Sequence, residues 1–355
     1  MNNFSDLTLD RRPVVKQGSS IPDKAVPGPI FKVSIVTENW NKAGETKKLN
    51  CGAMEILSCK LSGPPDVMNI SAVSAPVATS LRREEKNRPW QRTTLDKIAG
   101  DIARGAGLEL VYEVDDEIKL DRVDQIKKPD LVFLYELCLE YGIALKVCNK
   151  KIVLFDEAKY EQREAVATYS RVDVRDENNL NGGLLNYDFG QERTDTVCKS
   201  EVSYKDPKSG RLVKAEFIPP KPPVTGQVLR VKTRPGDLLG DLWRSGETKV
   251  GEEAGGTFET GFTKFNDTLP SFKQIRSDAT DNALRKARAL ARQRNKMEWP
   301  CELTVTLNLI LVGGVTFNIH GFGVYSGKYF VDQAIHNLGG GSTTTVSGHK
   351  VLEGY

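Results

Sequence analysis

Apolar and polar residues alternate along the first part of the chain. Phe31, Val33 and Ile35 are separated by polar residues, which is the pattern of a strand with one buried face. Further strands are predicted at residues 55–61 and 67–73. Strands of this length expose unpaired edges, so we expect them to join a barrel or another chain.

Residues 1–29 differ from the strands that follow them. Prolines at positions 13, 22, 27 and 29 oppose both a helix and a central strand. We therefore expect an N-terminal arm, of a kind that can become ordered against a neighbouring subunit.

Helical periodicity appears within residues 89–156. Thr93 or Thr94 is positioned to cap a first helix, whose apolar residues share one face until Gly105. A second helix is predicted to begin at Asp130, directly after a proline, and to end at a glycine. Both helices have the apolar face needed to cover a small sheet.

Strands are predicted between and after these two helices. Residues 108–114 form the first, and residues 144–148 and 151–155 flank Asn149 and Lys150, a pair typical of a hairpin turn. The order helix, strand, helix, hairpin indicates a compact α/β module.

Strand patterns return after residue 157. We expect a turn at 206–210, a long loop at 233–275 and a long helix at 278–297, capped by Ser277 or Asp278. The predicted strands are 196–204, 212–217, 227–231, 301–312, 315–320, 329–335 and 343–346. The last two are separated by consecutive glycines and are expected to pair.

The composition is that of a soluble globular protein. The chain has 355 residues, 39% of them apolar and 27% charged, which suggests two to four domains of about 100–150 residues. Its 50 basic and 47 acidic side chains give a formal charge of +3, so charge alone gives no case for nucleic-acid or membrane binding. No signal peptide and no membrane segment are predicted, so we expect synthesis in the cytoplasm.

The six cysteines have no C-x-x-C spacing, and zinc or redox motifs need such close spacing. We expect buried or half-buried free thiols in a reducing compartment. A disulfide between Cys51 and Cys59, or between Cys138 and Cys148, remains an alternative.

The predicted helix at 278–297 is the most basic element. Its cations are Arg285, Lys286, Arg288, Arg292, Arg294 and Lys296, and its thin apolar stripe consists mainly of alanine. A solvated face with favourable charges at the helix C-terminus is the favoured interpretation. The alternatives are an acidic protein partner and nucleic acid, although no aromatic residues lie between the cations.

The three histidines are the candidate imidazole catalysts. His320, His336 and His349 each lie in or beside a predicted strand, without a serine nucleophile elbow or a cysteine signature nearby. We expect each of them to be a hydrogen-bonded structural histidine.

Two further patterns resemble sites but have simpler interpretations. Asp115, Asp116 and Glu117 are adjacent in one loop and cannot readily flank a sugar ring, so a solvated turn is expected. The glycines from Gly321 to Gly327 precede a strand rather than a helix, and turn formation explains them. We therefore predict no catalytic residues, no cofactor and no metal.

Four phrases follow one another along the chain from about residue 90 to the C-terminus. They are TLDKIAGDIARGAGLEL with KPDLVFLYELCLEYGIALKVCNKKIVLFD, then VCKSEVSYKDPKSGRLVKAEF, then DATDNALRKARALARQRNKMEWPCELTV, and finally SGKYFVDQAIHNL. In this order they resemble the late-control D proteins of phages.

The resemblance implies an α+β, mainly β fold with two tail-tube-like β-barrels and a small α/β inserted domain. The expected domains are an arm at 1–29, part of the first barrel at 30–88, the inserted domain at 89–156 and the second barrel at 157–355. The second barrel would carry the loop 233–275 and the helix 278–297.

The resemblance also implies a structural baseplate hub of a contractile phage tail or a phage-tail-like particle, related to the hub part of type VI secretion spikes. Three copies would form a ring that joins a sixfold tail tube to a threefold spike. The expected partners are further copies of the chain (a homotrimer), a tail tube or tube-initiator protein, a spike protein and other baseplate proteins. Nucleic acid would only pass through the lumen. The expected location is the virion tail, assembled in the host cytoplasm, and no enzymatic activity is expected.

A cell-wall-acting tail protein is the alternative function. The capped helices and hairpin of residues 89–156 superficially resemble a peptidoglycan-binding module of the LysM kind, although an exposed aromatic platform is not obvious in the sequence. This alternative includes a cryptic hydrolase.

Overall fold

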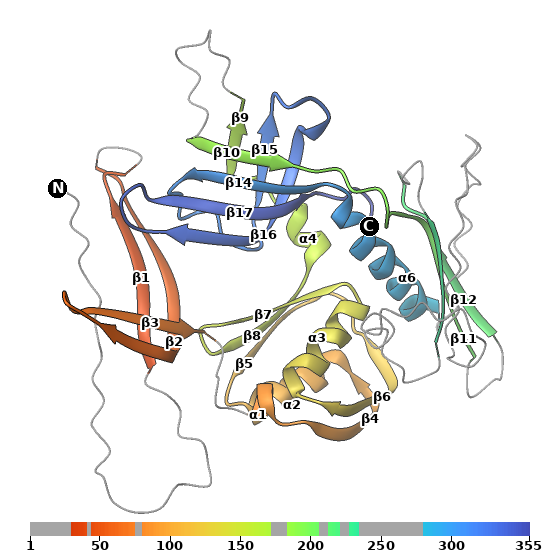
Figure 1. The fold of residues 1–355 in the computed structure, drawn as a ribbon. Helices are drawn as coiled ribbons and strands as arrows, with labels where there is room; N and C mark the ends of the chain where they lie inside the picture. Colours follow the sequence, from red (N-terminus) through yellow and green to blue (C-terminus); the bar gives the residue numbers. More distant parts are fainter. Residues whose placement is uncertain are drawn as a thin grey trace, which may run out of the picture. The chain divides into compact units, whose positions relative to one another are not determined.

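A computed structural model of the chain describes residues 30–40, 44–74, 80–171, 183–205, 212–220, 227–233 and 280–355. These residues are mainly β, as predicted, with fewer helices (Figure 1). They divide into two compact units, the first from residues 1–135 and 145–154 and the second from 136–144 and 155–355. The following predictions lie outside the described residues: the arm 1–29, the turn 206–210, the loop 233–275 and the cap at Ser277 or Asp278.

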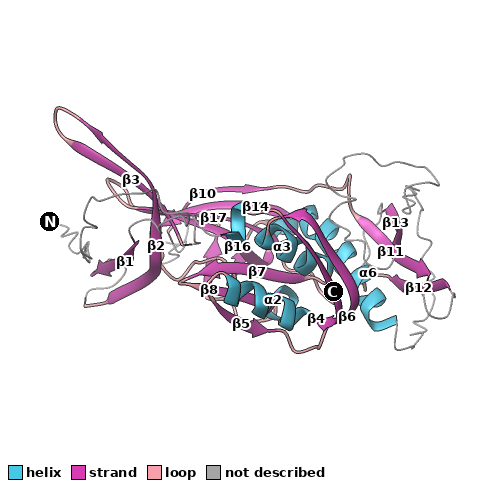
Figure 2. Cartoon of the chain, turned by 90° about the horizontal axis from the view of Figure 1, so that it is seen from below, coloured by secondary structure: helices cyan, strands magenta, loops and turns pink. Residues whose placement is uncertain are grey.

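The first unit begins with a three-stranded sheet in the order β1-β2-β3 (Figure 2). Its strands are β1 (Ile30–Glu38), β2 (Thr46–Ser62) and β3 (Val67–Val73). The first half of β2 pairs with β1 and the second half pairs with β3, so one long strand belongs to two hairpins. The predicted strands 55–61 and 67–73 are confirmed, and the first of them is the distal half of β2.

The two predicted helices of the first unit begin where the sequence predicts, whereas a third, short helix was not predicted. The short helix α1 (Ser80–Arg83) is followed by α2 (Leu95–Gly105) and α3 (Asp130–Glu140), and α3 continues from the first unit into the second. Thr94 occupies the cap position of α2, but its side chain makes no capping hydrogen bond. The predicted side-chain cap is therefore wrong, although the boundary is right.

Two strands of the first unit were not predicted. The antiparallel pair β4 (Lys86–Thr94) and β6 (Lys119–Lys128) forms a separate sheet. Both strands are rich in charged residues and bury few apolar side chains, which hides the alternation that identifies a strand. The predicted order of helix, strand, helix and hairpin therefore lacked this pair.

The predicted hairpin is present in a sheet of order β5-β8-β7. Its strands are β5 (Glu109–Glu113), β7 (Ile143–Cys148) and β8 (Lys151–Asp156). Asn149 and Lys150 have φ values of 49° and 60°, so the turn uses the left-handed conformation that favours this kind of dipeptide.

The second unit contains a six-stranded sheet in the order β10-β14-β17-β16-β15-β9 (Figure 1). The predicted pairing of its last two strands is confirmed by the register from Tyr329↔Lys350 to Asn337↔Thr343. The strand predicted to reach residue 312 ends at Thr306, because residues 307–315 form turns. The strands are β9 (Ala167–Ser170), β10 (Leu184–Phe189), β14 (Pro300–Thr306), β15 (Thr316–His320), β16 (Gly327–Asn337) and β17 (Thr343–Lys350).

One face of this sheet carries its hydrophobic core, and we call it the inner face. Leu303 and Val346 are partners across β14 and β17 and are each 1% exposed. Phe317 and Tyr329 stack at 5.8 Å between ring centroids. At Gly348 the strands approach so closely that a Cβ atom would lie 2.1 Å from the carbonyl oxygen of Phe330, so only glycine fits there.

A second sheet in this unit packs against a helix. Its strands are β11 (Val197–Lys205), β12 (Leu212–Phe217) and β13 (Gln227–Thr233), in the order β12-β11-β13. Helix α6 (Thr280–Asn295) covers it and is followed by η1 (Lys296–Glu298). The two strands predicted to flank the turn at 206–210, β11 and β12, pair antiparallel. The remaining elements are α4 (Glu157–Glu161) and η2 (Gly323–Tyr325).

Candidate functional site

Helix α6 carries the cations that the sequence marks as a candidate binding surface. Its alanine-rich stripe is buried against β11 and β12, where Ala287 and Ala291 are fully buried beside Val202. Small side chains allow the helix backbone to approach the sheet closely, and the Ser200 hydroxyl donates to the Ala287 carbonyl oxygen at 2.5 Å. This packing fixes which of the helix cations face the interior.

Most cations of α6 are paired inside the second unit. The Arg285 guanidinium donates to the Tyr141 carbonyl oxygen at 3.1 Å, and Lys286 forms an ion pair with the buried Glu140 carboxylate. The remaining ion pairs join Arg285 to Asp156, Arg292 to Glu157 and Glu161, Arg294 to Asp195, and Lys296, in η1 directly after α6, to Glu157.

The favoured interpretation of a solvated basic face is therefore wrong. The ion pairs of α6 also leave little of this face for nucleic acid or an acidic partner, because the partners of the cations belong to the same chain. Arg288 is the exception: it is exposed, and its guanidinium lies 5.7 Å from the Phe217 ring centroid. Four of the six cations predicted as a surface are therefore buried or half-buried in ion pairs, and Arg294 pairs with the exposed Asp195.

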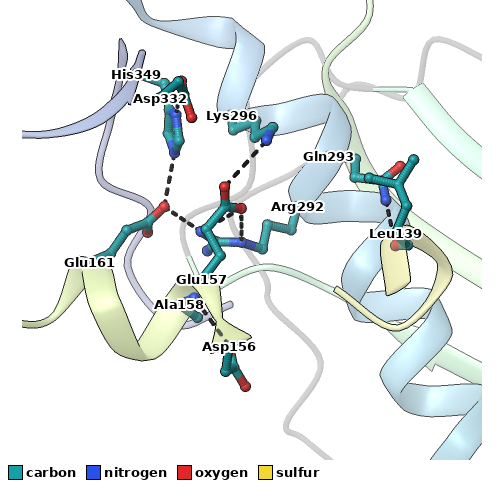
Figure 3. Close-up of polar contacts among 10 residues, drawn as sticks. All are labelled: Leu139, Asp156, Glu157, Ala158, Glu161, Arg292, Gln293, Lys296, Asp332 and His349. Carbon is teal, nitrogen blue, oxygen red and sulfur yellow. Dashed lines mark hydrogen bonds and ion pairs between the residues drawn. The ribbon is translucent and has the colours of Figure 1, made fainter. Parts of the chain in front are cut away.

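Arg292 is the centre of a buried charge cluster (Figure 3). Its guanidinium donates to Glu157 Oε2 at 3.3 Å and also to Glu161 Oε1. Glu161 Oε1 in turn lies 2.8 Å from Nε2 of His349, and Nδ1 of His349 lies 2.7 Å from Asp332 Oδ2. The cluster connects α4, α6, β16 and β17.

Burial and the neighbouring charges shift the pKa values of His349 and Glu161 in opposite directions. Burial alone would lower the pKa of His349, but the hydrogen bonds to Asp332 and Glu161 outweigh it and raise the pKa to about 9. Burial alone would raise the pKa of Glu161, but the hydrogen bond from His349 and the charge of Arg292 lower it. His349 is therefore protonated, and Glu161 ionised, at neutral pH.

The chemistry of the cluster favours a structural role. A histidine base needs a free lone pair, whereas both ring nitrogens of His349 are hydrogen-bonded and the side chain is 2% exposed. The described residues contain no group of three or more His, Cys, Asp or Glu side chains arranged to hold a metal ion. The cluster therefore holds together α4, α6, β16 and β17, which are far apart in the sequence.

Of the other two histidines, one is hydrogen-bonded and the other is exposed. His336 Nδ1 lies 2.9 Å from the Thr344 hydroxyl, and burial lowers the pKa of His336. His336 and His349 are thus hydrogen-bonded histidines as predicted. His320 is exposed at the end of β15, and the described residues offer its ring no hydrogen bond, so that prediction is wrong for His320.

The remaining sequence candidates form turns and free thiols. Asp115, Asp116 and Glu117 are exposed in the loop between β5 and β6, and the glycine-rich stretch from Gly321 forms a turn followed by β16, as predicted. All six cysteines are free, so the alternative disulfides are absent. Cys59 is exposed rather than buried or half-buried.

An open pocket lies in the first unit, between β4 and α2. It has a volume of about 620 Å³ and is lined by Trp90 together with polar side chains that include Gln91, Asp96 and Asp101. Trp90 is half-buried, with the Arg88 guanidinium 4.9 Å from its ring centroid. This pocket was not predicted, because its strand β4 was not predicted either. No helix in the described part of the chain is long and apolar enough to cross a membrane.

Comparison with known proteins identifies the fold. No protein-family model and no curated protein matches the chain. Among solved structures, a tail protein from Neisseria meningitidis aligns with a TM-score of 0.56 and 11% identity, over 92% of this chain and 88% of that one. The 43 kDa tail protein of prophage MuSo2 from Shewanella oneidensis aligns with a TM-score of 0.54 and 10% identity, over 91% and 89%. The chain therefore has the fold of these two tail proteins.

Proposed function

We propose that the chain is a structural hub protein in the baseplate of a contractile phage tail or a phage-tail-like particle. The single observation that carries the proposal is the shared fold with two tail proteins over about nine-tenths of each chain. In this proposal three copies form a ring that joins the sixfold tail tube to the threefold spike. The late-control D family is the family that the order of the sequence phrases supports.

Open sheet edges support assembly into a ring. Within the described residues, β10 and β9 are the two edge strands of the six-stranded sheet, and β3 is an edge of the three-stranded sheet. Unpaired edges attract further strands, and copies arranged around an axis can pair them without leaving an open end. We propose that the two sheets belong to two tube-like barrels, with residues 89–156 as an inserted domain.

The interior of the second unit supports a role without catalysis. The most basic helix uses its cations for internal ion pairs, and the buried histidine is held between two carboxylates. We propose that the hub has no catalytic, cofactor or metal site, and that nucleic acid only passes through its lumen. Its partners in this proposal are the tail tube or tube-initiator protein, the spike and other baseplate proteins, in the virion tail.

The ring is tested by measuring the mass and symmetry of the assembled protein. We expect light scattering of the purified chain with its spike partner to give three copies, and electron microscopy of the assembly to show a threefold ring at the end of a tube. A stable monomer that binds neither spike nor tube would contradict the proposal.

Glycan binding is a second candidate function, favoured by the pocket beside Trp90. An aromatic ring flanked by polar side chains is a common arrangement for binding small polar ligands, and the pocket is open to solvent. The candidate therefore has a physical site, although the sequence showed no aromatic platform.

A sedimentation assay with purified peptidoglycan separates this candidate from the hub. If the pocket binds glycan, the full chain sediments with peptidoglycan and Trp90→Ala lowers the bound fraction at least tenfold. Arg83→Ala, at an exposed position outside the pocket lining, serves as a control and should bind like the unmodified chain. A hub without glycan binding gives no retention, and a zymogram without clearing argues against a hydrolase.

A further inference from the structure

The distal hairpin of β2 and β3 has one apolar and one polar face. Cross-strand partners point to the same side of a sheet, and the register pairs Cys59 with Ile70 and Leu61 with Met68. On the opposite side the register pairs Lys60 with Asn69. The hairpin therefore has the binary pattern of a sheet with a covered face.

Both faces of this hairpin are nevertheless exposed. Every residue from 57 to 71 is exposed, including Leu61 at 64%, Met68 at 58% and Ile70 at 43%. A two-stranded hairpin in water is marginally stable, and its apolar face gains stability only when something covers it. Within the described residues, the outer edge of β3 is also unpaired.

The edge strand β10 of the second unit has a matching pattern. Tyr187 is 45% exposed and lies opposite the buried Leu303, on the inner face. Asp188 lies opposite Glu302 on the other face, and both are exposed. Two carboxylates that face each other across a strand pair repel one another, so a cation at this edge would be stabilising.

We propose that β3 of one copy pairs with the edge of β10 in a second copy of this chain. The joined sheet places Met68 and Ile70 on the same face as Tyr187, and it places Lys60 on the same face as Asp188 and Glu302. The apolar faces are continuous, and Lys60, which is separated from β10 by β3, adds a positive charge to the face that carries Asp188 and Glu302. The inference rests on the proposed ring and names the contact that closes it.

A second copy fits this surface better than an unrelated partner. The contact joins two different surfaces of the same chain, and a head-to-tail contact of this kind generates a ring when the rotation closes. A stable interface buries roughly 800 Å² per partner. The hairpin covers part of this area, and in a ring each copy makes the contact twice, once through β3 and once through β10.

Paired cysteines test the contact in the full-length chain. In a Cys59→Ser background, Met68→Cys or Ile70→Cys is combined with Tyr187→Cys and oxidised mildly, because neighbouring strands bring such Cβ atoms to about 5 Å. We expect covalent multimers from at least one of these pairs. Asn69→Cys with Tyr187→Cys is the matched control and should give none, because Asn69 points to the opposite face.

The outcomes separate this contact from the ring itself. A threefold assembly without Met68 or Ile70 cross-links overturns the contact but leaves the ring. A disulfide within one chain, detected as an oxidised monomer, also overturns the contact. So does a result in which the cysteines of the hairpin cross-link only to a different tail protein. If no assembly forms even with the spike and tube partners, the ring proposal fails as well.

Lysine substitutions on the apolar face of the hairpin are a second test, and this test does not involve Tyr187. Leu61→Lys and Met68→Lys place a charge on the apolar face at positions that are already exposed, so we expect unchanged circular dichroism and at least a tenfold weaker self-association. Asn69→Lys, on the polar face, should associate like the unmodified chain. Equal association by all three variants would overturn the contact.

Discussion

Replacing Arg292 by alanine is expected to lower the free energy of unfolding by about 3–5 kcal/mol. Arg292 donates to Glu157 and Glu161, and the Glu161 side chain is 1% exposed. Without the guanidinium, an ionised carboxylate remains buried with only His349 to balance it. Urea denaturation followed by circular dichroism measures the change, with the slope used to check that unfolding remains two-state.

Two variants of the same helix control for the loss of a basic residue. Arg288→Ala removes an exposed cation, so we expect a loss below about 1 kcal/mol. Arg292→Lys keeps the charge but loses the planar donor pair, so its stability should lie between those of the unmodified chain and the alanine variant. If Arg292→Ala unfolds at the same urea concentration as Arg288→Ala, the cluster does not stabilise the fold.

The second large effect is a loss of stability as the solution becomes alkaline. His349 has an unfolded pKa near 6.5 and a folded pKa of about 9, so the folded state holds the proton more tightly. This stabilisation is complete below pH 6.5 and is lost as the pH rises through 9. The pKa difference corresponds to about 3 kcal/mol. Glu161 works in the opposite sense: its lowered pKa adds stability above its unfolded pKa, and this is lost in acid.

Thermal or urea unfolding between pH 6 and 10 measures this dependence. We expect His349→Gln to be less stable than the unmodified chain at pH 6 and to lose little further stability up to pH 9. His336→Gln is the matched control, because burial lowers the pKa of His336, and it should retain the alkaline loss. An equally steep alkaline loss in His349→Gln would show that other groups cause it.

The elements that the sequence predicted are those defined by local signals. Asn149 and Lys150 adopt the left-handed conformations that a tight hairpin requires, and the alanine stripe of α6 faces its sheet. The closing pair β16 and β17 was predicted because its strands alternate and a glycine turn joins them. In each case the signal that predicts the element lies within one or two neighbouring segments, even where, as for α6 and β11, the packing partner is distant in the sequence.

The charge cluster could not be predicted because its members are distant in the sequence. Arg292 lies 131 residues from Glu161, and His349 lies 188 residues from the same carboxylate. Helix α4 has five residues and no apolar stripe, so nothing marked Glu157 or Glu161 as a partner.

The position of β17 has a consequence for biosynthesis. This strand comprises residues 343–350, yet it lies between β14 and β16 and pairs with both. On the ribosome, β14 and β16 emerge before the strand that joins them, and their apolar side chains stay exposed until it arrives. A truncated mRNA that ends before codon 343 would therefore yield a chain in which β14 and β16 have no strand between them. We expect chaperones and proteases to recognise the exposed apolar side chains of such a chain.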